Sequence, residues 1–280
     1  MPLSDKERRH YRLLQRNSCH AVWKGDLLEI TYLPHTVKSN HHRTRGTIKG
    51  FTQSARLRML KTVATVEWAR VKRAVFITLT YPDSHADRSM QQRTRDRYLF
   101  LRSMEKHLGN KVGVLWRVEW QPRKSGARKG QLTAHMHLIA FGVSFIDKEV
   151  VRQCWRDVLD ADGPVVTWIE GMKDGRKVAR YVSKYCAKKV ENDVLDNASY
   201  LNSLGRHWGM CRRELIPWAE RFHVPYLDAK DIHLAENLAC MTFRYFTRGT
   251  QQGFSVFGEK ARKVGEILFE RMIDKESHLA

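Results

Sequence analysis

The middle of the chain alternates hydrophobic and polar residues as half-buried β-strands do. KVGVLWRVEWQ, residues 111–121, places five apolar side chains on one face and three polar side chains on the other: Val112, Val114, Trp116, Val118 and Trp120 against Arg117, Glu119 and Gln121. In TAHMHLIAFG, residues 133–142, His135 and His137 share a face while Met136 lies on the opposite one. The short, basic and Gly-containing segment PRKSGARKG between them predicts an antiparallel hairpin.

Patterns on either side of this hairpin predict the remaining elements. VFITLTYP and PVVTWIE are typical of short strands, and Asp147 is placed as the N-cap of a helix. The helices are predicted over residues 52–71, 88–108, 147–160 and 175–190. The order strand, helix, strand, strand, helix, strand, helix predicts an α+β fold, with a mixed antiparallel sheet and helices on one side.

No repeat and no long Gly, Pro or Ser linker marks a sharp domain boundary. We expect a basic N-terminal lead over residues 1–50, a main domain over 51–190 and a C-terminal accessory region over 191–280. Residues 258–280 predict a terminal helix that serves either packing or dimer contact. No apolar run approaches the roughly 18 residues of a membrane span, and the N-terminus is too charged for a signal peptide, so we expect a cytoplasmic protein with no membrane partner.

The charge balance points to a polyanionic partner. The chain has 50 Lys and Arg against 30 Asp and Glu, a formal net charge of +20. Such a field attracts nucleic acid, and a membrane surface is disfavoured because no long basic amphipathic helix stands out at either end. A basic surface without a specific ligand remains the alternative.

The two strand histidines are candidate metal ligands. If the hairpin forms, Glu119 and Gln121 face the same side as His135 and His137, so that two nitrogens and an oxygen can hold one divalent ion. Three protein ligands leave coordination positions open, as catalytic metal sites do. Histidine pairs in strands also occur as surface residues without a ligand.

The segment RYVSKYCAKK supplies candidate nucleophiles. Tyr181, Tyr185 and Lys188 recur at helical spacing on one face, with Lys184 on its flank. A phenol with a pKa of about 10 is almost wholly protonated near neutrality, but a cation and nearby ammonium groups favour the phenolate. A tyrosine of this kind can attack a DNA phosphodiester, become esterified to the 5′ phosphate and release a 3′ hydroxyl. Two ordinary amphipathic tyrosines are the alternative.

Three segments, in this order, resemble a known family. FITLTYP is similar to the first strand motif of HUH endonucleases, HMHLIAFG to their His-hydrophobic-His motif, and YVSKYCAKK to their tandem tyrosine motif. GFTQSARLRMLKTV and GRHWGM are similar to flanking segments in rolling-circle replication initiators of phages and plasmids. The resemblance covers roughly residues 50–210.

The resemblance implies a ferredoxin-like central antiparallel sheet, with helices packed on it and a C-terminal helical extension. It also implies a nuclease and strand transferase that nicks one strand at a replication origin. His135 and His137 would bind Mg²⁺ or Mn²⁺ with Glu119 or Gln121 as third ligand. Tyr181 and Tyr185 would be alternating nucleophiles, and Lys184 and Lys188 phosphate partners or proton shuttles.

The expected partner is single-stranded or supercoiled DNA at an origin. The dipeptide Gly-Lys never occurs, so there is no Walker A loop, and we expect duplex opening to come from supercoiling or a host helicase. The candidate DNA-backbone contacts are Arg123, Lys124, Arg128, Lys129, Arg180 and Arg206. An HUH transposase or relaxase is the enzymatic alternative, and a non-catalytic nucleic-acid-binding protein is the alternative of another class.

Overall fold

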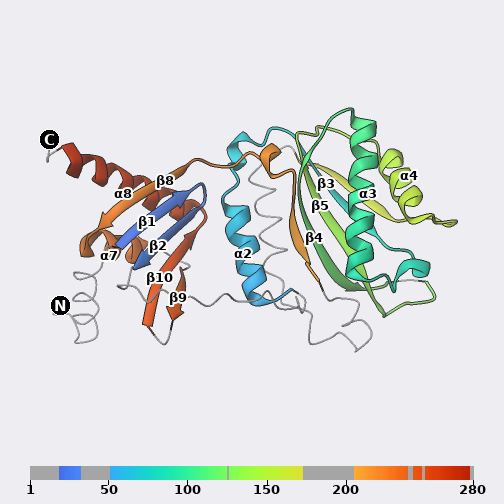
Figure 1. Cartoon of the computed structure of the whole chain (residues 1–280), viewed down its shortest axis with the longest axis horizontal. Coiled ribbons are helices and arrows are strands. Elements are labelled where there is room, and N and C mark those ends of the chain that lie inside the picture. The colour runs from blue at the N-terminus through green and yellow to red at the C-terminus, as the bar shows by residue number, and fades with distance from the viewer. Residues whose placement is uncertain are drawn as a thin grey trace. The chain divides into compact units, whose positions relative to one another are not determined.

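The computed structural model describes residues 19–32, 51–124, 126–172, 205–238, 242–247 and 250–277. These residues divide into two compact units, each built on a five-stranded antiparallel sheet (Figure 1). The central unit takes the described parts of Thr44–Val63 and Trp68–Pro217, and the terminal unit those of Met1–Arg43, Ala64–Glu67 and Trp218–Ala280. The domain limits expected from the sequence stay a prediction.

The central unit contains the hairpin predicted from the sequence. Its sheet has the strand order β6-β3-β5-β4-β7, and all the pairs are antiparallel. The strands are β3 (Ala74–Thr80), β4 (Gly113–Pro122), β5 (Leu132–Phe141), β6 (Thr167–Met172) and β7 (Trp208–Cys211). Along the chain, β3 to β6 are interrupted by α3 (Met90–Leu108) after β3 and by α4 (Lys148–Leu159) after β5. This succession confirms the predicted α+β class and the order strand, helix, strand, strand, helix, strand.

One face of this sheet packs against α3 and α4. The apolar positions of β3, β4 and β5 form a single buried core with residues of the two helices, among them Phe100 of α3 and Trp155 of α4. Asp147 caps α4 as predicted, because its side chain accepts a hydrogen bond from the Glu149 amide. Ser89 and Gln92 form a capping box that begins α3, and Gly109 ends it in the left-handed conformation. The helices are therefore fixed in length by local sequence signals.

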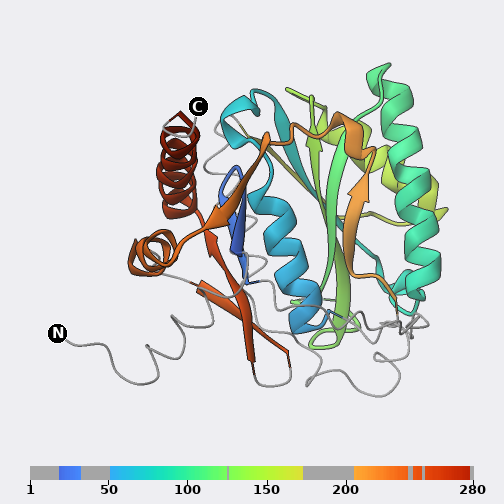
Figure 2. The ribbon, with the colours of Figure 1, turned by 60° about the vertical axis from the view of Figure 1, so that its left-hand side comes forward.

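The other face of the sheet is approached by α2 (Gln53–Ala64), so the prediction of helices on one side only is wrong. Figure 2 shows α2 on the side of the sheet opposite α3 and α4. Phe51, just before α2, lies under the guanidinium of Arg117 on β4, 4.5 Å from the ring centre. The predicted helix 52–71 is also shorter than expected, because a 3₁₀ turn at Trp68–Arg70 follows the end of α2. The described part of the central unit also contains 3₁₀ turns at Asp83–His85 and Arg213–Leu215.

The terminal unit has strands that the sequence analysis missed. Its sheet has the order β8-β1-β2-β10-β9, and it packs against α7 (Ala229–Leu238) and α8 (Glu259–Ser277) through a separate core. The strands are β1 (Cys19–Lys24), β2 (Leu27–Tyr32), β8 (Arg221–Leu227), β9 (Thr242–Thr247) and β10 (Thr250–Phe257). The helix α8 confirms the predicted terminal helix, but the C-terminal region is α+β instead of helical only.

Sequence distance explains why the terminal unit was missed. Its sheet pairs β1 with β8 and β2 with β10, strands about two hundred residues apart along the chain. Local patterning in β8 is also weakened by Pro225, a residue depleted in strands. None of the helices in the described part of the chain is both long and apolar enough to cross a membrane.

The core face of β5 gives a first prediction. Met136 lies between His135 and His137 in the sequence, but its side chain points to the opposite face of β5, where it is fully buried in the core. We expect Met136→Ala to lower the free energy of unfolding by about 2–5 kcal/mol, because it leaves a cavity in the core. Urea unfolding followed by circular dichroism measures this loss.

The control is Phe145→Ala in the same unit, since the Phe145 side chain is 76% exposed. Its effect should stay within about 0.5 kcal/mol. Equal effects of the two substitutions would contradict the assignment of Met136 to the core face.

Candidate active site

Three neighbouring strands, β3, β5 and β4, present polar side chains from one face of the central sheet. Residues directly opposite each other in antiparallel strands project from the same face. The register therefore forms two rows across the sheet: Thr80, His135 and Glu119 in one, and Thr78, His137 and Arg117 in the other. The predicted placement of Glu119 on the face of the two histidines is confirmed. This face lies opposite the core that holds α3 and α4.

His137 is held on both ring nitrogens. Its Nε2 lies 3.0 Å from Oε2 of Glu119, and its Nδ1 lies 3.0 Å from the hydroxyl oxygen of Thr78. The Phe76 ring stacks beside the imidazole, with centres 5.6 Å apart and planes 17° apart. Both His137 and Glu119 are buried, with 7% and 2% of their surface exposed. The imidazole thus has little freedom to rotate.

His135 repeats the arrangement one row further along the sheet. Its Nδ1 lies 3.0 Å from the hydroxyl oxygen of Thr80. Its ring is nearly parallel to that of His137, with an angle of 12° and a centre-to-centre distance of 6.4 Å. His135 is half-buried, so it is the more accessible of the two imidazoles.

Gln121, the rival ligand, lies beyond this group. It is opposite Thr133 on β5 and half-buried, two residue pairs further from His137 than Glu119 is. Arg117, which the sequence analysis did not single out, is opposite His137 and buried. The geometry therefore favours Glu119 over Gln121 as the oxygen donor nearest the imidazoles.

Imidazole and carboxylate are ligand types that divalent cations accept. Two such donors, His137 Nε2 and Glu119 Oε2, lie 3.0 Å apart and contact each other directly. The threonine hydroxyls contact Nδ1 of each ring, so Nε2 is the nitrogen that would face an ion, and in His137 this nitrogen contacts Glu119. Among the described residues, no three His, Cys, Asp or Glu side chains are already arranged as metal ligands. His135 would have to approach the His137–Glu119 pair to complete the set.

The predicted nucleophiles fall in a different part of the chain. Tyr181, Tyr185, Lys184 and Lys188, with the candidate DNA contact Arg180, lie outside the described residues. Their roles stay predictions.

Tyr81 directly follows Thr80 in the sequence, but it is a buried structural residue and no candidate nucleophile. Its side chain is fully buried and its hydroxyl donates a hydrogen bond to Oδ2 of Asp96, 3.2 Å away. Burial, reinforced by the Asp96 carboxylate, raises the pKa of Tyr81 well above its usual value of 10. The phenol therefore stays protonated and unreactive.

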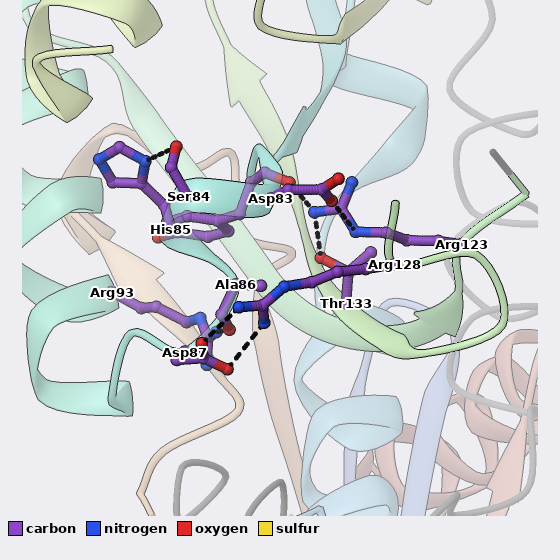
Figure 3. Close-up of polar contacts among 10 residues, drawn as sticks. Asp83, Ser84, His85, Ala86, Asp87, Arg93, Arg123, Arg128 and Thr133 are labelled. Carbon is purple, nitrogen blue, oxygen red and sulfur yellow. Dashed lines mark hydrogen bonds and ion pairs between the residues drawn. The ribbon is translucent and has the colours of Figure 1, made fainter. Parts of the chain in front are cut away.

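The loop of the predicted hairpin is clamped to the segment after β3. Figure 3 shows two arginines of the loop reaching two aspartates of that segment. The Nε of Arg123 is 2.8 Å from Asp83, and its Nη2 donates to the Tyr81 carbonyl at 2.6 Å and to the Thr133 hydroxyl at 3.2 Å. Arg123 is thus committed to internal contacts, and a role in DNA binding would compete with them.

Arg128 forms the outer part of the clamp. Its guanidinium binds both carboxylate oxygens of Asp87, at 3.0 and 2.9 Å, and this pair is exposed to solvent. The Arg128 guanidinium lowers the pKa of Asp87, as expected for a charge-assisted hydrogen bond. Lys124, Lys129 and Arg206 are exposed at the surface. DNA contact by these side chains stays a prediction.

The clamp gives a second prediction. Arg123→Ala should lower the free energy of unfolding of the central unit by about 1.5–3 kcal/mol, because it removes charge-assisted hydrogen bonds from a largely buried guanidinium. The matched variant Arg128→Ala should cost under about 1 kcal/mol, since its ion pair is exposed. Urea unfolding of both variants measures the difference, and an Arg128→Ala effect as large as that of Arg123→Ala would contradict it.

Comparison with known proteins places this site within a family. Residues 74–190 match the family described as Replication-associated protein ORF2/G2P. The matched segment begins with β3 and includes Glu119, His135 and His137 as well as Tyr181 and Tyr185. No curated protein and no solved structure matches the chain. The predicted resemblance is confirmed: over residues 74–190 the chain carries a domain of the ORF2/G2P replication-associated proteins, a family of phage rolling-circle replication initiators.

Proposed function

We propose that this protein initiates rolling-circle DNA replication by nicking one strand of an origin and becoming linked to the 5′ phosphate through a tyrosine. The observation that carries the proposal is the extent of the family match, which contains the polar rows of β3, β5 and β4 together with the tandem tyrosines. The strand order β6-β3-β5-β4 with its two intervening helices also agrees with the ferredoxin-like sheet that the HUH resemblance implied.

The side chains on the polar face would orient the scissile phosphate. His135, His137 and Glu119 are the residues we propose to hold Mg²⁺ or Mn²⁺, with Gln121 as the alternative oxygen donor. A divalent ion bound there would supply positive charge to the phosphate oxygens as the pentavalent transition state forms. Arg117 adds a cation to the same face, opposite His137.

The chemical step would be carried by the tyrosines. The hydroxyl oxygen of Tyr181 or Tyr185 attacks phosphorus and loses its proton, and the 3′ oxygen leaves and takes up a proton. Lys184 and Lys188 would stabilise the phosphate charge or pass these protons. The phosphotyrosine ester keeps the energy of the broken bond, so a 3′ hydroxyl can later rejoin the strand without ATP.

DNA binding would rely on the net charge of +20, with Lys124, Lys129, Arg180 and Arg206 as backbone contacts. Arg123 and Arg128 could join them only by exchanging their aspartate partners for phosphates. The origin would be presented as single-stranded or supercoiled DNA in the cytoplasm of a bacterial host, with a host helicase opening the duplex.

The covalent link is the test of the proposal. Supercoiled DNA of the replicon that encodes the gene, incubated with the protein and Mn²⁺, should yield nicked circles with protein attached to a 5′ end. Denaturing gels that retain the protein on labelled DNA measure this product. Changing both Tyr181 and Tyr185 to Phe should reduce it at least ~10³-fold, because no phenol remains to attack the phosphate.

The matched control is Tyr98→Phe, which changes an exposed tyrosine on α3. It should leave the product unchanged. Nicked circles without attached protein would contradict the tyrosine mechanism. Binding of the DNA without any nicking would contradict the proposal and support the alternative of a non-catalytic DNA-binding protein.

Substitutions in the polar rows test the metal ligands. His135→Ala should lower cleavage at least ~10²-fold with a modest loss of DNA binding, because a cation acts more on the transition state than on the ground state. Glu119→Gln should weaken Mn²⁺ binding at least ~10-fold, as followed by the electron paramagnetic resonance signal of free Mn²⁺. Gln keeps the shape of Glu and can still accept a hydrogen bond from His137.

Gln121→Ala is the comparison variant, and its Mn²⁺ affinity should stay within about threefold of the wild type. The opposite order, with Gln121→Ala the weaker binder, would make Gln121 the third ligand. Equal losses of cleavage and of DNA binding in His135→Ala would indicate a structural histidine.

A further inference from the structure

We propose that Thr78 and Thr80 are positioning residues whose hydroxyl groups hold His137 and His135 and can keep these hydrogen bonds, as donor or as acceptor, whether or not a cation is bound. The inference rests on the proposed function, because it concerns the same pair of histidines. It assigns a role to two polar positions in the strand VFITLTYP that the nicking mechanism does not otherwise use.

Each hydroxyl reaches one imidazole. Thr78 Oγ1 lies 3.0 Å from His137 Nδ1, and Thr80 Oγ1 lies 3.0 Å from His135 Nδ1. Both contacts follow from the register, in which Thr78 is opposite His137 and Thr80 is opposite His135. The same threonine–histidine contact therefore occurs at two successive positions on one face of β3.

The contact between His137 and Glu119 is the geometric ground for the tautomer that we assign to the neutral ring. A carboxylate only accepts hydrogen bonds, so neutral His137 needs a proton on Nε2 to donate across the 3.0 Å to Glu119. Its Nδ1 then carries a lone pair and needs a donor, which the Thr78 hydroxyl can be. In this state the hydroxyl donates to the ring.

A cation on Nε2 requires the opposite tautomer. With the Nε2 lone pair given to an ion, the neutral His137 ring would carry its proton on Nδ1, and that N–H would need an acceptor. A hydroxyl can donate or accept by rotating its hydrogen, whereas a carbonyl or carboxylate can only accept. Threonine therefore keeps the Nδ1 hydrogen bond in both states, and valine at the same position would keep it in neither.

The threonines are themselves fixed in place. The Thr80 amide donates to the Val166 carbonyl at 3.1 Å, and the Thr80 carbonyl accepts from Nε1 of Trp155 at 3.0 Å. Thr78 lies within the ladders of β3 with both β5 and β6. A β-branched side chain on such a backbone has few rotamers. The hydroxyls are thus held at constant positions while their hydrogens remain free to turn.

Mn²⁺ binding to the full-length protein tests the inference. We expect Thr78→Val and Thr80→Val each to weaken Mn²⁺ binding about 10- to 100-fold, the range for losing a partner of a metal-binding histidine. Thr78→Ser should bind within about threefold of the wild type, because it restores the hydroxyl. Free Mn²⁺ is measured by electron paramagnetic resonance, and a thermal melt verifies that each variant is folded.

The matched control is Thr167→Val on β6. Thr167 is buried opposite Leu79 on the core side, and its hydroxyl has no hydrogen-bond partner in the described part of the chain. This threonine-to-valine change should leave Mn²⁺ affinity unaltered. A loss as large as that of Thr78→Val would show a general packing effect and overturn the inference.

A second readout needs no metal. Long-range ¹H–¹⁵N spectra of the histidine rings, assigned with His137→Ala, should show the proton of His137 on Nε2 in the metal-free protein. Thr78→Val should shift the Nδ1 resonance toward that of a nitrogen without a hydrogen-bond donor, and Thr78→Ser should restore it. An Nδ1 resonance that ignores Thr78→Val would overturn the inference.

The outcomes separate this inference from the proposed function. Wild-type protein that binds Mn²⁺ and nicks DNA, with a Thr78→Val variant that binds Mn²⁺ equally well, overturns the inference and leaves the function intact. Wild-type protein that binds no Mn²⁺ overturns the metal site and the inference together.

Discussion

The register between β3, β5 and β4 is the constraint on which the candidate site depends. Because side chains alternate along a strand, a slip of one residue in either pairing would turn a whole set of polar side chains toward the core. The observed register instead aligns a hydroxyl, an imidazole and a carboxylate across three strands: Thr80, His135 and Glu119. Residues far apart along the chain thereby become neighbours on one face of the sheet.

The opposite face of the sheet supplies the force that fixes this register. Val118, Met136 and Leu79 lie in the core beneath α3 and α4, and moving them to the polar face would expose apolar surface. Trp155 adds a directional contact, since its indole donates to the carbonyl of Thr80. The clamp from Arg123 to Asp83 and the Tyr81 carbonyl secures the end of β3 where the polar rows stop. Core packing and site geometry are thus two consequences of one pairing.

The central unit could be predicted from sequence because its signals are local. Alternation in residues 111–121 and 133–142 gave both strands and the face of Glu119, and the Asp147 cap marked the start of α4. Two features of the structure could not be predicted from the local sequence. The roles of Thr78 and Thr80 require the pairing of β3 with β5, which is nearly sixty residues away, and the terminal sheet requires pairing over a still longer separation. Neither leaves a periodic mark in the local sequence.

The polar rows also bear on what the sheet is for. Glu119 and His137 are almost wholly buried, and burying ionisable groups costs free energy unless each finds a partner. Apolar side chains of similar size at the same positions would often be neutral or more stable. Partners are present here, the carboxylate for one imidazole nitrogen and a threonine hydroxyl for the other. A sheet that already has a complete apolar core on one face does not need this second, polar arrangement for folding. We therefore relate its cost to the site proposed on that face, within the segment that matches a replication-initiator family.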